Sequence, residues 1–247
     1  MNALKPGLNA PQRLAQASPD FEQKLAETRQ LLQLASATHR HLKQASSLGA
    51  EDVVISHLIA QLQLLIPVFV LDTGALHHQT LALLERQQAS GRWQLEVFRP
   101  DHEQVIAWVA RHGQNAITQS IERRKDCCRL RKLEPLSRAL QGQTAWITGL
   151  RREQSDERAE VELIDTSEQG PSGRTKYNPL ALWTMGDIWH FILENQIDYN
   201  PLHDEFYPSI GCAPCTRAIS LGEPFRAGRW WWEDESAKEC GLHTRTA

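Results

Sequence analysis

Short apolar segments alternate with amphipathic segments along most of the chain, and this alternation limits the possible folds more than any other feature. Apolar residues at helical spacing predict helices over about residues 21–41, 77–88 and 103–113. Four segments read as strands: "IPVFVLDTG", "RWQLEVF", "TAWITG" and "EVELID". Strands that alternate with helices form mostly parallel sheets, so we expect a single α/β domain.

Ligands of such sheets bind beyond the carboxyl ends of the strands. The loops at residues 46–49, 72–74 and 149–155 are predicted to lie there. The first loop, "SSLG", is followed by the predicted helix "AEDVVISHLIAQL" and is similar to a turn whose hydroxyl and N–H groups cradle a phosphate. An ordinary helix N-cap accounts for the same residues equally well.

Composition narrows the class of protein. The 247 residues are 41% hydrophobic and 23% charged, with a formal net charge of −3, which disfavours a general nucleic-acid binder. The longest apolar run, "LLIPVFVL", is too short to span a bilayer, and the first residues lack the apolar centre of a secretory signal. Five cysteines, an odd number, do not suit a disulfide framework, so we expect a reducing cytoplasm and no membrane.

Two tight cysteine pairs suggest a metal centre. Cys127 and Cys128 stand in the basic run "RRKDCCRLRK", and Cys212 and Cys215 in "GCAPCTR". Four cysteines in two pairs match the ligands of a tetrahedral zinc ion or of an iron–sulfur cluster. Four reduced, buried cysteines without a metal are the simpler explanation, which the pairing disfavours.

An iron–sulfur cluster suits the pair better than zinc does. Adjacent cysteines on a helix point about 100° apart, so they reach two irons of a cube more easily than one small ion. The cluster with its thiolates is anionic, and nearby cations would offset its charge. We expect these cations to be Arg124, Lys125, Arg129, Arg131 and Lys132, the last on the same helix face as Cys128.

The fifth cysteine, Cys240, lies in "KECGLH" near the chain end. Neighbouring cations lower the pKa of a thiol and so favour the nucleophilic thiolate, although a tail cysteine is more often incidental. Arg226 and Arg229, in "RAGRWWW", are spaced to grip an anion. We therefore divide the chain into a flexible arm (residues 1–20), an α/β domain with the cysteine pairs (21–225) and a mobile tail (226–247).

Seven motifs together resemble one family, the assimilatory adenylyl-sulfate (APS) reductases of the iron–sulfur type. In chain order they are "SSLGAEDVV", "VLDTG", "RRKDCCRLRKLEPL", "WITGLRREQS", "KYNPLALWTMGDIWHFI", "YNPLHDEFYPSIGCAPCTRAI" and "RAGRWWWEDESAKECGLH". The resemblance runs from about residue 45 to 245 and implies an adenine-nucleotide alpha-hydrolase-like fold, related to the PP-loop pyrophosphatases. It implies reduction of adenosine 5′-phosphosulfate to sulfite and AMP, with reduced thioredoxin or glutaredoxin as the donor, for cysteine biosynthesis.

The resemblance also assigns roles to residues. Cys240 is expected to be the nucleophile that becomes S-sulfocysteine, and the four paired cysteines are expected to hold a [4Fe–4S] cluster that is not the electron donor. The expected substrate contacts are Ser46, Ser47, Gly49, Leu71, Thr73, Lys132, Gly149, Arg158, Arg226, Arg229, Trp230 and His243.

Three other functions stay open. A 3′-phosphoadenylyl sulfate (PAPS) reductase or dual-substrate enzyme keeps the family, although that branch typically lacks the four cluster cysteines. A PP-loop ATP pyrophosphatase or tRNA-thiolating enzyme is disfavoured because the turn lacks "SGGxDS" and the chain is acidic. In a non-enzymatic zinc module, Cys240 would be idle. A homo-oligomer is compatible with the sequence.

Overall fold

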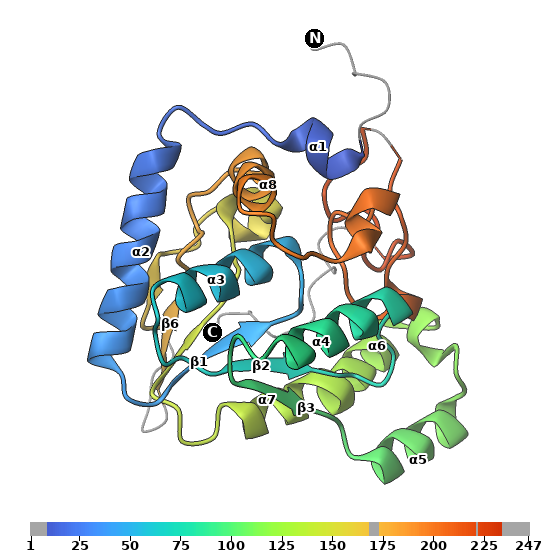
Figure 1. Ribbon diagram of the computed structural model, residues 1–247. Coiled ribbons are helices and arrows are strands. Elements are labelled where there is room, and N and C mark those ends of the chain that lie inside the picture. The colour runs from blue at the N-terminus through green and yellow to red at the C-terminus, as the bar shows by residue number, and fades with distance from the viewer. Residues whose placement is uncertain (1–8, 168–172, 221, 234–247) are drawn as a thin grey trace.

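A six-stranded sheet forms the centre of the computed structural model, which describes residues 9–167, 173–220 and 222–233 (Figure 1). The strand order is β3-β2-β1-β4-β6-β5, and neighbouring strands are parallel except β5, which pairs antiparallel with β6. The strands are β1 (Leu42–Ser46), β2 (Val68–Leu71), β3 (Leu95–Phe98), β4 (Ala145–Ile147), β5 (Ile164–Asp165) and β6 (Thr175–Tyr177). The prediction of a mostly parallel α/β domain is confirmed.

Helices cover both faces of the sheet. The longer ones are α2 (Phe21–Thr38), α3 (Ala50–Gln61), α4 (His78–Ser90), α5 (His102–His112), α6 (Ile121–Cys128), α7 (Glu134–Ala139) and α8 (Met185–Glu194). The short ones are α1 (Ala10–Leu14), η1 (Ala116–Thr118), η2 (Arg129–Leu133), η3 (Arg152–Gln154), η4 (Asp156–Arg158), η5 (Pro201–Glu205) and η6 (Ala213–Cys215). Within the described ranges, every helix is too short or too polar to cross a bilayer.

The alternation of side chains along β2 explains how the two faces are covered. Val70 points to one face and packs with Leu83 and Leu84 of α4, whereas Phe69 points to the other and packs with Ala139 of α7. The largest core cluster lies on the first face and joins α2, α3 and α8. A sheet buried on both faces needs strands that are apolar throughout, and "VFVL" has that composition.

Two strands at the edge differ from the sequence-based prediction. "EVELID" contributes only the two-residue β5, and β6, with the sequence Thr-Lys-Tyr, was not predicted. The charged Lys176 at its centre hides the strand from a search for apolar runs. In the structure Lys176 is buried, with its Nζ 3.7 Å from Asp165 and 5.2 Å from the centre of the Trp146 ring.

The described part of the predicted N-terminal arm packs against the domain. Helix α1 contacts α8, and the Gln16 N–H donates to the carbonyl of Gly186 at 3.3 Å. Further along, the buried Asp187 accepts from the Ser18 N–H at 2.7 Å and the Thr184 N–H at 2.9 Å. Thr184 and Asp187 also form a capping box at the start of α8. The boundary at residue 20 stays a prediction.

Replacing Asp187 with Ala is expected to lower the free energy of unfolding at neutral pH by about 3 kcal/mol, because it leaves two partly buried N–H donors without their charged acceptor. Burial acts to raise the pKa of Asp187, yet the hydrogen bonds from Ser18 and Thr184 hold it below its ordinary 3.8. The difference in unfolding free energy between the wild type and the variant should therefore shrink as the pH falls through that pKa and the carboxylate becomes protonated.

Urea unfolding at neutral and at progressively lower pH measures this difference. Asp198→Ala is the control, because Asp198 forms a half-exposed pair with Arg86 and its loss should cost less than about 1 kcal/mol. Equal losses in the two variants would contradict the structural role of Asp187.

Candidate functional site

A pocket opens at the carboxyl ends of β1, β2 and β4. The chain adds β2 and β3 on one side of β1 and then returns to add β4 on the other, so the sheet has its topological switch point between β1 and β4. Ligands of open α/β sheets bind at such a point. The pocket is lined by eleven of the twelve predicted substrate contacts: Ser46, Ser47, Gly49, Leu71, Thr73, Lys132, Gly149, Arg158, Arg226, Arg229 and Trp230.

Two predicted site residues, Cys240 and His243, lie outside the described residues. Their roles therefore stay predictions.

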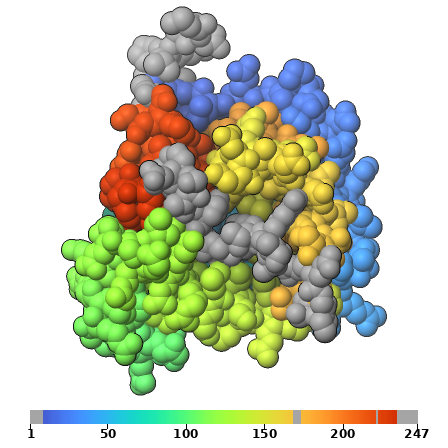
Figure 2. Space-filling view, turned by 180° about the vertical axis from the view of Figure 1, so that it is seen from behind, coloured from blue at the N-terminus to red at the C-terminus, as the bar shows by residue number. Residues whose placement is uncertain are grey.

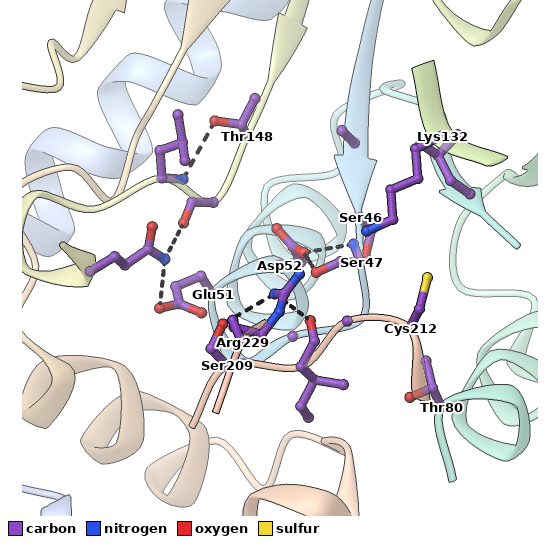
Figure 3. A pocket seen from close by; sticks show the side chains of 18 of the residues that line it. Ser46, Ser47, Glu51, Asp52, Thr80, Lys132, Thr148, Ser209, Cys212 and Arg229 are labelled. Carbon is purple, nitrogen blue, oxygen red and sulfur yellow. Dashed lines mark hydrogen bonds between the residues drawn. The ribbon is translucent and has the colours of Figure 1, made fainter. Parts of the chain in front are cut away.

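The turn between β1 and α3 is held by its own side chains. Leu48 has a φ of 61°, in the left-handed region, and its N–H donates to the Ser46 hydroxyl at 3.1 Å. The carboxylate of Asp52, in the first turn of α3, accepts from both the Ser47 N–H and the Ser47 hydroxyl at 2.7 Å (Figure 3). Burial raises the pKa of Asp52 to about 6, although the bonds from Ser47 act in the opposite direction.

Gly149 contacts this turn from the end of β4. A Cβ atom on residue 149 would lie 2.5 Å from Oδ1 of Asp52 and 2.9 Å from Cβ of Glu51, so any side chain here would displace the start of α3. The neighbouring Glu51 carboxylate accepts from Arg151 at 2.9 Å and from Gln154 at 3.0 Å. Arg151 is fully buried, so this ion pair holds Glu51, which lines the pocket, to the interior behind it.

Basic side chains from separate elements reach the pocket. Lys132, Arg158, Arg226 and Arg229 line it, and Figure 3 shows Lys132 and Arg229 extending toward it from different parts of the chain. Arg229 donates to the Ser209 hydroxyl at 3.3 Å and lies against Gly211, where a Cβ would be 2.6 Å from its Nη2. Four cations around one cavity favour an anionic ligand.

The four cysteines come together beside this pocket. Cys128, Cys212 and Cys215 belong to one buried cluster with Trp230, and the half-buried Cys127 packs against it. Cys212 forms an antiparallel bridge with Leu76, and its Sγ lies 3.2 Å from the Thr73 hydroxyl. The loop after β2 thus attaches the second cysteine pair to the sheet.

The donor set fits an iron–sulfur cube. All four described cysteines are free thiols, and burial raises the pKa of Cys127, and that of Cys215 to about 12, so a bound metal would favour the thiolate at these two positions. Among the described residues, no three Cys, His, Asp or Glu side chains converge closely enough to hold a single ion. Each thiolate of a cube binds a different iron, so a cube does not require such convergence.

Three cations of the basic run act on the cysteines. Arg131 and Lys132 both act to lower the pKa of Cys127, as a cation near a thiolate should. Arg124 is buried in an ion pair with Glu233 at 2.7 Å; burial acts to lower its pKa, yet Glu233 and the charge and hydrogen bond of Cys128 raise it. The exposed Arg129 instead pairs with Asp126 at 2.9 Å.

The backbone changes form where the cysteine helix ends. Residues Arg129–Leu133 form a π-helical turn, in which hydrogen bonds run from i to i+5. The spacing rule for an α-helix thus does not apply between Cys128 and Lys132. Such turns are frequent at functional sites, and this one carries Lys132 to the pocket.

Several pocket residues were not predicted from the sequence. Glu51 and Asp52 line the pocket, and their position directly after the Ser/Gly turn was the available signal. Residues 209–211 and Phe225 also line it. Residues 209–211 directly precede Cys212 in one of the seven motifs, whereas Phe225 lies in loop-rich sequence that has no periodic pattern.

Comparison with known proteins agrees with this geometry. Residues 41–218 match the phosphoadenosine phosphosulfate reductase domain. The chain is 46% identical to the adenosine 5′-phosphosulfate reductase of Burkholderia cepacia, over 93% of this chain and 91% of that protein. It is 49% identical to the enzyme of the same name from Allochromatium vinosum, over 81% of this chain and 78% of that protein.

Solved structures extend the comparison to the fold. The phosphoadenylyl-sulfate reductase of Candida auris, crystallised as a phosphate complex, aligns with a TM-score of 0.65 at 25% identity, covering 83% of this chain and 98% of that chain. FMN adenylyltransferase of Candida glabrata shares the fold alone, with a TM-score of 0.58 at 13% identity over 91% of this chain and 80% of that chain. From the matched domain and the identity to these relatives, the chain belongs to the phosphoadenosine phosphosulfate reductase family.

Proposed function

We propose that the protein reduces adenosine 5′-phosphosulfate to sulfite and AMP in sulfate assimilation, with reduced thioredoxin or glutaredoxin as the dithiol donor. The observation that carries this proposal is the pocket itself, where a Ser/Gly turn and four basic side chains meet beside four cysteines. The relatives that are 46% and 49% identical carry the name of this activity. A reducing cytoplasm, as expected from the cysteine content, suits both the thiols and the donor.

The reaction proceeds in two exchanges. The Cys240 thiolate attacks the sulfate sulfur, an S–S bond forms, the bond from sulfur to the phosphate oxygen breaks, and AMP leaves with the electron pair. A thiolate of the donor then attacks the Cys240 sulfur and releases sulfite. The donor's second thiol completes its disulfide and returns Cys240 to a thiol, so the donor supplies the two electrons that convert sulfate to sulfite.

The pocket side chains bind and neutralise the substrate. A sulfate group carries charge on its oxygens, and a thiolate approaches its sulfur only where cations offset that charge. We assign this role to Lys132, Arg158, Arg226 and Arg229. Ser46, Ser47 and Gly49 bind the phosphosulfate from the turn, Leu71, Thr73 and Gly149 contact the nucleoside, and Trp230 lies beside them. His243 is a further expected contact.

Cys127, Cys128, Cys212 and Cys215 would hold a [4Fe–4S] cluster. When bound, the cluster cross-links the two cysteine segments and adds local charge, and it is not the electron donor. The chain's own contribution is the buried setting of the thiols and the cations Arg131 and Lys132 beside them.

PAPS is the second candidate substrate, because the matched domain and the Candida auris structure carry its name. APS is favoured by the higher identity to proteins named for it.

The covalent route predicts a protein adduct. Anaerobic incubation with APS and no thiol donor should add one SO₃ to the intact mass, map to Cys240, and disappear when reduced thioredoxin is added. An adduct that forms with PAPS alone would indicate that PAPS is the substrate. If neither substrate gives an adduct, the proposed covalent route is refuted.

Replacing Cys240 with Ser is expected to abolish turnover while the brown colour of the cluster stays, because Cys240 is separate in the sequence from the four cysteine ligands. Visible absorbance, iron content and sulfite release measure the two effects. Turnover close to the wild-type rate would refute the assignment of the nucleophile.

Replacing Lys132 with Ala is expected to lower kcat/KM by about a hundredfold or more, because one preorganised charge at the reacting group is lost. The melting temperature should change much less, as Lys132 lines the pocket rather than the core. Steady-state kinetics and thermal melting separate the effects, with the exposed Lys125→Ala as the control. A variant that is largely unfolded would contradict this role.

A further inference from the structure

Trp230 occupies an unusual position on the pocket wall. Its side chain is fully buried, and its ring lies 4.5 Å from the guanidinium carbon of Arg124 and 4.7 Å from that of Arg229. Its φ of 41° falls in the left-handed region, which is disfavoured for a bulky residue. The surroundings must therefore hold Trp230 in place.

Arg124 and Glu233 supply one of these restraints. The guanidinium donates Nε to Oε1 at 3.0 Å and Nη2 to Oε2 at 2.7 Å, a bidentate pair in which both side chains are almost completely buried. Bidentate pairs fix direction as well as distance. Neither residue lines the pocket, so any effect on a ligand must pass through other side chains.

The pair joins two parts of the chain that lie far apart in the sequence. Arg124 lies on α6, one helical turn before Cys128, and Glu233 follows the segment that supplies Arg226, Arg229 and Trp230 to the pocket. Figure 2 shows the C-terminal segment, in red, against the region of α5 and α6, in green. The backbone N–H of Trp230 also donates to the Cys215 carbonyl at 3.2 Å, so the segment that carries Trp230 contacts both cysteine segments.

We propose that Arg124 and Glu233 are positioning residues, whose ion pair holds Trp230 and Arg229 at the pocket in the arrangement that binds the nucleotide. The inference rests on the proposed function, because it takes the adenosine 5′-phosphate part of the substrate as the ligand. Arg124 acts on this ligand through the Trp230 ring, and Glu233 acts by orienting Arg124.

Stability alone does not account for this pair. Burying two charges costs desolvation energy, and well-packed apolar residues of similar volume often stabilise a protein equally well or better. Apolar residues would fill the same space but could not hold the Trp230 ring by a cation–π contact of fixed direction. The two roles can therefore be separated by experiment.

The affinity of the purified holoenzyme for AMP, measured by equilibrium titration, tests the proposal. Glu233→Gln should weaken AMP binding by about tenfold, since small displacements of binding groups have effects of that size or more. Glu223→Gln is the matched control, because Glu223 forms a bidentate but more exposed pair with Arg217 away from the pocket. The control should bind AMP within about twofold of the wild type, as expected for an exposed pair.

The double variant Arg124→Met/Glu233→Met removes both charges and separates position from stability. We expect its melting temperature to recover most of what a single variant loses, while its AMP affinity stays low. This variant also decides the matter if the single variants fail to fold.

Wild-type affinity in a folded Glu233→Gln variant or in the double variant would overturn the proposal, because the pair would then serve stability only. Failure of the wild type to bind AMP or APS would be a different result. It would overturn the proposed function, and the inference would fall with it.

Discussion

The contact between the loop after β2 and the second cysteine pair is the interaction on which the rest of the site depends. The Ala213 N–H donates to the Ala75 carbonyl at 2.7 Å, and Cys212 pairs with Leu76 across an antiparallel bridge. This short pairing holds the second cysteine pair at the carboxyl end of β2. The segment that carries Arg229 and Trp230 is attached in turn to this pair, through the bridge of Thr216 with Arg229 and the hydrogen bond from the Trp230 backbone N–H to the Cys215 carbonyl.

Charge at the site is arranged in two layers. The acids nearest the pocket are already occupied: Glu51 by Arg151 and Gln154, and Asp52 by Ser47. The four basic side chains that line the cavity come from three separate segments, with Lys132 in one, Arg158 in another, and Arg226 and Arg229 in the third. Because these segments are brought together only by the fold, the positive field exists in the folded protein although the chain as a whole has a net charge of −3.

The sequence predicted the parts of the molecule that have a local signal. The alternation of strands and helices and the loops at 46–49, 72–74 and 149–155 follow from periodicity or from turn residues, and the structure confirms them. The strand β6 was missed because its central lysine becomes buried only through tertiary contacts with Asp165 and Trp146. The pairing of Arg124 with Glu233 joins residues 109 positions apart, and no local pattern marks such a pair.

The close approach of Gly149 to Asp52 has a consequence for how this site can change during evolution. Gly149 follows β4 and Asp52 lies in the first turn of α3, yet a Cβ on residue 149 would lie 2.5 Å from the Asp52 carboxylate and 2.9 Å from Cβ of Glu51. A lineage that acquired a side chain at 149 would have to displace the start of α3, which carries the acceptor that fixes Ser47. The loop after β4 and the turn between β1 and α3 are therefore expected to covary in sequence. Relatives that keep this anion-binding turn are expected to keep the glycine that faces it.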